Sequence, residues 1–160
     1  MYNIIFTLDY EIHGNGDGCP MELMVAPTWK LMKQLEKYDA KLTIMADVAE
    51  IIKFIEYKEK YRSDKFYSNE INEQLKYAVA NGHDVQLHIH SSYLKSKYNS
   101  RWNQNWEEYN LAALSYERIN EIIFQCKTYL EELLSPINND YKCNVFRAAN
   151  WSMYPTKNIV

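Results

Sequence analysis

The sequence predicts an α/β domain built on a parallel sheet, and three observations support this class. Short apolar runs alternate with longer segments whose apolar residues recur every three or four positions. Turn residues separate these segments, and no internal repeat or linker interrupts them. Alternation of strands and helices is typical of parallel sheets with right-handed crossovers. The chain has 160 residues, of which 47% are hydrophobic, so we expect one domain over 1–160 with its own core.

The predicted elements follow the order β-α-β-α-α-β-α-β. Strands rich in Ile, Val, Leu or Phe are expected at 2–8, 42–45, 83–88 and 143–146. Helices with an apolar stripe are expected at 26–38, 48–55, 66–81 and 115–134. Asp47 is placed to cap the second helix and Gly82 to end the third, and 91–110 is expected to form a long polar and aromatic loop.

Composition excludes several classes of protein. The chain carries 18 Lys and Arg against 21 Asp and Glu, which argues against a nucleic-acid or anionic-membrane surface. No apolar run approaches the roughly 20 residues needed to span a bilayer, and no signal-peptide pattern opens the chain. The three cysteines are far apart and form no CxxC motif, so reduced thiols are expected. We therefore expect a cytoplasmic protein without a membrane span.

Polar side chains gather where the predicted strands end. Asp9 and Glu11 follow the first apolar run, His88 and His90 follow the third, and Arg147 follows the fourth. Alternate residues of a strand point to the same face, so each pair shares one face. Carboxylate and imidazole groups together are typical ligands of zinc or iron in hydrolases. Because function in parallel sheets gathers at the carboxyl ends of the strands, one metal site is predicted there.

Each of these residues also has a simpler interpretation. A lone Asp at a strand exit is commonly a turn residue, and a lone His such as His88 is commonly a half-buried core residue. The first strand looks buried on both faces, so a carboxylate there needs a partner or a function. Arg147 is expected to form a salt bridge, which is compatible with holding Asp9 ionised and oriented. Trp151 is interpreted either as the wall of a sugar pocket or as a packing residue.

Other catalytic chemistries find no support in the sequence. There is no G-x-S-x-G elbow and no P-loop, and the glycines of 14–18 do not match G-x-G-x-x-G. None of the three cysteines has a histidine close in sequence.

Three motifs in order resemble the polysaccharide deacetylase superfamily (carbohydrate esterase family 4, the NodB-homology domain). The resemblance is closest to an intracellular branch found beside surface-polysaccharide genes. It implies a distorted (β/α)7 barrel, a divalent metal and removal of an acetyl group from an N-acetylated sugar or polysaccharide precursor. The metal would most commonly be zinc, with iron, cobalt, manganese or nickel as alternatives. The matching segments are Phe6–Glu11, Gly82–His90 and Phe146–Trp151.

The resemblance also implies roles for single residues. Asp9 would be the general base and Arg147 would orient it. Glu11 and His88 would be metal ligands, with His90 as a candidate third ligand. The residues expected to contact substrate are Tyr10, Tyr93 and Trp151.

The chain departs from the family pattern in two ways. The family spaces its histidines as H-x-x-x-H, but Ser92 stands four residues after His88. Either His90 or a residue beyond the chain end would then complete the ligand set. The family's later motifs, which supply a catalytic-acid histidine, are absent, since no histidine follows His90. About four strands are expected, so the barrel would be incomplete and end abruptly near Val160.

Two other classes of function stay open on the sequence. One is a non-catalytic carbohydrate-binding or remnant domain that stacks sugars on Trp102, Trp106 and Trp151. The other is self-association, because an incomplete barrel exposes a sheet edge.

Overall fold

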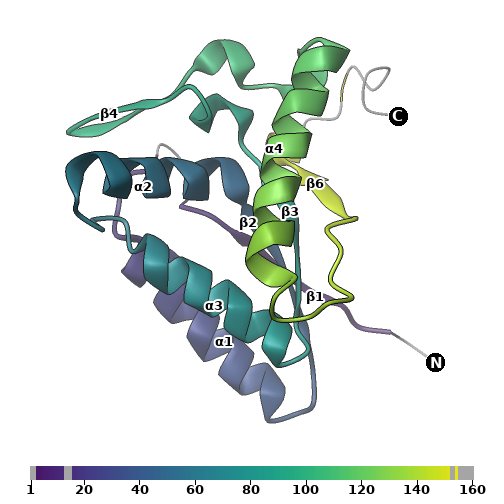
Figure 1. Cartoon of the computed structure of the whole chain (residues 1–160). Coiled ribbons are helices and arrows are strands. Elements are labelled where there is room, and N and C mark those ends of the chain that lie inside the picture. The colour runs from purple at the N-terminus through teal and green to yellow at the C-terminus, as the bar shows by residue number, and fades with distance from the viewer. Residues whose placement is uncertain (1–2, 13–15, 152–153, 155–160) are drawn as a thin grey trace.

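The computed structural model describes residues 3–12, 16–151 and 154 (Figure 1). Four parallel strands form one sheet in the spatial order β1-β2-β3-β6. Two edge strands, β1 and β6, therefore flank the central pair. The strands are β1 Phe6–Tyr10, β2 Leu42–Asp47, β3 Asp84–Ile89 and β6 Phe146–Ala148.

Four helices connect these strands and cover one face of the sheet (Figure 1). The α-helices are α1 Ala26–Glu36, α2 Val48–Tyr61, α3 Ser68–Ala80 and α4 Tyr116–Leu134. A π-helical turn, Met21–Val25, leads into α1. The mixed α/β class and the parallel sheet predicted from the sequence are confirmed.

The register of the sheet divides its side chains between two faces. Ile44 pairs with Leu8 and Val85 across neighbouring strands. Ile44 and Val85 are fully buried in the core beneath the helices. Residues one position further along the strands point to the opposite face, because side chains alternate along a strand. Asp9, Met45 and Gln86 form one such row across the sheet.

The sheet is curled toward this second face. In a flat sheet, β1 and β6 would lie about 14 Å apart, three strand spacings. Yet the guanidinium of Arg147 on β6 forms an ion pair with the carboxylate of Asp9 on β1. The four strands therefore make a curled half-barrel, which is compatible with an incomplete β/α barrel.

Local signals in the sequence explain where the helices begin and end. The Asp47 carboxylate accepts a hydrogen bond from the Glu50 amide at the start of α2 (3.4 Å). The Ser115 hydroxyl accepts one from the Arg118 amide at the start of α4 (3.2 Å). Gly82 follows α3 with a φ of 77°, a left-handed conformation that favours glycine. The predicted helix-capping role of Asp47 and helix-ending role of Gly82 are confirmed.

Three predictions about the fold are wrong. The fourth strand is Phe146–Ala148 rather than 143–146, so Arg147 lies within it instead of after it. The first strand runs from Phe6 to Tyr10 and is not buried on both faces, since Phe6 is 41% exposed and Thr7, on the other face, is also exposed. The reason is its position at the sheet edge, where only β2 lies beside it among the described elements. The long loop at 91–110 contains an antiparallel hairpin of β4 Lys97–Asn99 and β5 Arg101–Asn103, flanked by short 3-10 turns.

Candidate metal centre

The carboxyl ends of the strands bring several polar side chains together. Asp47 at the end of β2 pairs in register with His88 of β3, and His88 pairs with Arg147 of β6. Glu11 follows β1 directly, and His90 follows β3 directly. Residues that are far apart in the sequence therefore meet at one edge of the sheet.

Glu11, His88 and His90 form a three-residue group that can hold a metal ion. One ligand atom from each residue lies within 4.8 Å of the other two. The Glu11 Oε2 atom lies 2.6 Å from His90 Nε2 and 3.5 Å from His88 Nε2. One carboxylate and two imidazoles are a common ligand set for catalytic zinc, and three protein ligands leave a position open. The donor atoms present thus fit a divalent transition metal.

Hydrogen bonds hold the His88 imidazole and the backbone of His90 in place. His88 Nδ1 lies 2.8 Å from the carbonyl oxygen of Arg147. A carbonyl oxygen can only accept, so Nδ1 carries a proton, which leaves Nε2 to bind a metal ion or, when protonated, to donate to Glu11. The backbone amide of His90 donates to Asp47 Oδ1 (3.1 Å). Contacts of this kind fix the direction of metal-binding histidines.

Burial and mutual hydrogen bonds shift the pKa values of Glu11, His88 and His90. Burial disfavours the Glu11 carboxylate, but hydrogen bonds with His88 and His90 outweigh burial and hold its pKa well below the usual range. Burial likewise disfavours the charged imidazoles, but Glu11 and Asp47 outweigh it and raise the pKa of both histidines. The site therefore favours positive charge beside Glu11, whether supplied by protons or by a metal ion.

Asp9 and Arg147 form a second polar pair beside this group. Their side chains are 33% and 27% exposed, so the pair is open to solvent in part. The ion pair holds the Asp9 carboxylate in a defined position above the concave face. Since the Arg147 carbonyl also contacts His88, Arg147 links the ion pair to the three-residue group.

Two carboxylates beneath the site were missed by sequence reasoning. The sequence predicts a helix cap at Asp47 and no role for Glu50, yet both side chains are fully buried. Glu50 Oε2 accepts a hydrogen bond from the amide of Ile12 (3.0 Å), next to Glu11 in the chain. Burial raises the pKa of both carboxyl groups. The available signal was the D-x-x-E spacing at the exit of an apolar strand, which places both acids near the predicted site.

Of the three residues predicted to contact substrate, Tyr10 and Tyr93 lie in the core and Trp151 lies in the turn after β6. Tyr10 is buried, and its hydroxyl donates to Gln74 Oε1 on α3 (2.6 Å). Tyr93 is also buried, in the 3-10 turn that follows His90. Both rings therefore pack in the core, and substrate contact by either stays a prediction. Trp151 lies in the turn after β6, and its side chain is outside the described part of the chain.

Trp102, expected to stack on a sugar, is a core residue. It is 5% exposed, and its ring lies 5.2 Å from that of Phe66 and 6.0 Å from that of Phe54. The reason is the hairpin, which carries Trp102 onto α2. Trp106 remains exposed beside Tyr109, with ring centroids 5.6 Å apart.

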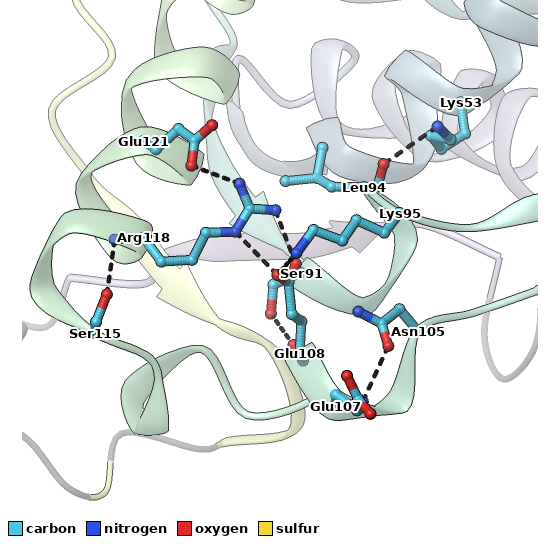
Figure 2. Close-up of polar contacts among 10 residues, drawn as sticks. All are labelled: Lys53, Ser91, Leu94, Lys95, Asn105, Glu107, Glu108, Ser115, Arg118 and Glu121. Carbon is cyan, nitrogen blue, oxygen red and sulfur yellow. Dashed lines mark hydrogen bonds and ion pairs between the residues drawn. The ribbon is translucent and has the colours of Figure 1, made fainter.

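A charged cluster ties the segment after His90 to α4 (Figure 2). The buried carboxylate of Glu108 accepts hydrogen bonds from Arg118 Nε (3.0 Å) and Nη2 (2.8 Å) and pairs with Lys95. The backbone carbonyl of Glu108 accepts a hydrogen bond from the hydroxyl of Ser91, the residue directly after His90. This cluster thus supports the loop that carries one imidazole of the site.

No family model, curated protein or solved structure matches the chain. Among the described residues, no helix combines the length and apolar character that crossing a bilayer requires.

Proposed function

We propose that this chain is a metal-dependent hydrolase domain of the polysaccharide deacetylase type. Its reaction would remove the acetyl group from an N-acetylated sugar during surface-polysaccharide biosynthesis. The observation that carries the proposal is the group of Glu11, His88 and His90 at the same sheet edge as the Asp9–Arg147 ion pair. Metal ligands beside a positioned carboxylate are what hydrolysis of an amide requires.

Each residue has a role in this proposal. Glu11, His88 and His90 hold the ion, with zinc favoured by the ligand set and iron, cobalt, manganese or nickel as alternatives. When bound, a divalent ion polarises the amide carbonyl and lowers the pKa of water. Asp9 accepts the proton of the attacking water as general base. Arg147 pairs with Asp9 and keeps its carboxylate directed over the concave face.

The sequence motifs and the curled sheet support the same family. The motif order places Asp9, His88 and Arg147 on three parallel strands, as a β/α barrel requires. We propose that these strands are the first part of a distorted (β/α)7 barrel. No histidine follows His90 within residues 1–160, so the proposal assigns no catalytic acid to them.

A carbohydrate-binding role without turnover is the second candidate. The exposed, neighbouring rings of Trp106 and Tyr109 favour it, because flat aromatic surfaces stack on sugar rings. Burial of Trp102 removes one of the rings on which this candidate depended.

The test is acetate release from N-acetylated oligosaccharides by the zinc-loaded chain. We expect turnover that is lost in Asp9→Asn although zinc still binds, and kept in the surface control Glu121→Gln. Zinc binding without acetate release in the wild type would contradict the hydrolase. Sugar binding that depends on Trp106 but not on zinc would support the second candidate.

A further inference from the structure

A cavity of about 90 Å³ lies between β1 and the helical segment that follows it in the chain. Residues 8–11 line the cavity from the strand, so the candidate base Asp9 and the candidate metal ligand Glu11 both border it. The π-helical turn Met21–Val25 and the first turns of α1 supply the opposite wall. The cavity therefore adjoins the candidate site at the carboxyl end of β1.

The helical wall of the cavity is apolar from its base to its rim. Leu23, Pro27 and Leu31 recur every four residues, and all three line the cavity. Met24 and Thr28 form the neighbouring row, which is buried. Leu23 is 54% exposed and Leu31 is 38% exposed, so the rim leaves apolar side chains in contact with water. An apolar group that entered the cavity would cover them.

Local features of the sequence shape this wall. Pro27 has no amide hydrogen to donate, and the turn before it widens into a π-helix in which the Ala26 amide bonds to the carbonyl oxygen of Met21. Gly18, with a φ of 139°, lies against the Leu23 side chain, where a Cβ would clash with Leu23 Cδ1. The rim residue Leu23 is therefore packed against the backbone despite its exposure.

The position of the cavity indicates which part of an amide substrate would enter it. The carbon that water attacks carries the carbonyl oxygen, the leaving nitrogen and the acyl chain. In the proposed function, Asp9 takes a proton from that water and Glu11 helps to hold the ion at that oxygen, so the acyl chain begins next to both residues. Apolar walls suit a hydrocarbon chain, whereas a sugar hydroxyl would lose hydrogen bonds to water there.

We propose that this cavity binds the acyl chain of the substrate, and that the protein favours N-propionyl and N-butyryl sugars over N-acetyl sugars. The inference rests on the proposed function, because it names the substrate of that same site. One water molecule needs about 10–15 Å³ of such volume, and a methyl group is of similar size. The cavity of about 90 Å³ therefore has room for more than the single methyl group of an acetyl.

The reaction releases the acyl chain as a carboxylate. The water oxygen bonds to the acyl carbon as the carbon–nitrogen bond breaks. Both protons of the water end on the nitrogen, so the sugar leaves as an ammonium ion. Each methylene group that enters the cavity is removed from water, which should raise affinity about fourfold.

The first test measures binding without turnover. Acetamide, propanamide and butanamide are titrated into the metal-free protein with a chelator present, and the methyl signal of Met24 is followed by NMR. Its loss in Met24→Leu identifies this signal. We expect affinity to rise about fourfold with each added methylene. Equal affinity for the three amides, or a Met24 signal that does not respond, would overturn the pocket whether or not the protein is a hydrolase.

Two variants that fill the cavity sharpen this test. Leu23→Trp and Leu31→Trp should each remove the gain in affinity with chain length. Both positions are partly exposed, so the variants should fold, and circular dichroism checks this. Ile137→Trp is the matched control, because Ile137 is an exposed apolar residue (41%) in the segment after α4 and should keep the gain. A gain that persists in both cavity variants would overturn the proposal.

Kinetics of the zinc-loaded protein then connect the pocket with the proposed function. The value of kcat/KM should rise about fourfold per methylene from N-acetyl- to N-butyrylglucosamine, and Leu31→Trp should abolish this rise. Amide binding that follows chain length without hydrolysis of any of these sugars would support the pocket and contradict the hydrolase. Hydrolysis at equal rates for all three sugars would contradict the pocket and support the hydrolase.

Discussion

Arg147 on β6 forms an ion pair with Asp9 on β1, which joins the two edge strands across the concave face. The backbone carbonyl of the same arginine accepts a hydrogen bond from His88 Nδ1. One residue thus orients both the candidate base and a candidate metal ligand, the first through its side chain and the second through its backbone. A substitution of the Arg147 side chain can therefore remove the contact with Asp9 and leave the backbone contact with His88.

Replacing the Arg147 side chain should damage catalysis more than metal binding. Arg147→Met leaves the carbonyl contact with His88 but frees the Asp9 carboxylate, so we expect acetate release to fall about 10²-fold. Zinc affinity should change by less than about tenfold. Arg147→Lys keeps the charge and should recover part of the rate. Parallel measurement of kcat and the zinc dissociation constant checks this, and an equal loss of both would contradict the assignment.

Removing the Asp47 carboxylate should weaken metal binding, although Asp47 is not one of the three ligands. Its Oδ1 atom accepts the His90 amide and holds the loop that carries this imidazole. We expect Asp47→Ala to lower zinc affinity about 10–100-fold, as loss of a group that supports metal ligands does. Titration calorimetry with zinc measures the change.

A matched control separates this effect from lost helix capping. Asp64 accepts the amides of Ser68 (2.7 Å) and Asn69 (3.1 Å) at the start of α3, so Asp64→Ala also removes a helix-capping carboxylate. It should lower the free energy of unfolding by about 1 kcal/mol and leave zinc affinity unchanged. Equal zinc affinity in both variants would show that Asp47 only caps α2.

The stability of the metal-free chain should decline as pH rises through neutrality. Glu11 raises the pKa of His88 and His90 in the folded state above the value of 6.5 for a free imidazole. The protonated histidines therefore stabilise the fold fully below pH 6.5, and this contribution is lost as pH rises through the folded-state pKa. Chemical unfolding with a chelator at several pH values measures it. Glu11→Gln should flatten the profile, and a stability that rises over this range would contradict the account.

The charged cluster at Glu108 should contribute measurably to stability. Arg118→Met removes two hydrogen bonds to a carboxylate whose side chain is 7% exposed. We expect the free energy of unfolding to fall by about 1–3 kcal/mol and exchange of the 91–110 amides to quicken. Glu121→Gln removes only the exposed partner of Arg118 and should cost less than about 1 kcal/mol. Similar losses in the two variants would contradict a special role for Glu108.

The sheet and helices could be predicted because their signals are local. Buried strands such as β2 read as apolar runs, and α4 shows an apolar stripe from Ile119 to Leu134 with Ser115 as its cap. The grouping of Glu11, His88 and His90 could also be predicted, because each residue lies at the end of a recognisable strand. Alternation along each strand, and the rule that parallel strands end at one edge, bring them together.

What the sequence did not reveal depends on long-range packing. The β4–β5 hairpin turns at Ser100 with a φ of 57°, and no Asn-Gly or Asp-Gly pair marks this turn. Burial of Trp102 follows from the contact of this hairpin with Phe66 and α2. The burial of Glu50 also depends on long-range packing. The segment around Ile12 and the turn at Tyr93 cover the start of α2, which would otherwise face water.

The most direct test of the account is the metal content of the purified chain by elemental analysis. We predict about one equivalent of zinc or another transition metal per chain, lost in His88→Ala. His83→Gln is the matched control, because His83 is buried and its Nδ1 accepts the Leu42 amide (2.9 Å) away from the group. This variant should keep its metal. No bound metal after reconstitution, or full metal content in His88→Ala, would contradict a metal site formed by Glu11, His88 and His90.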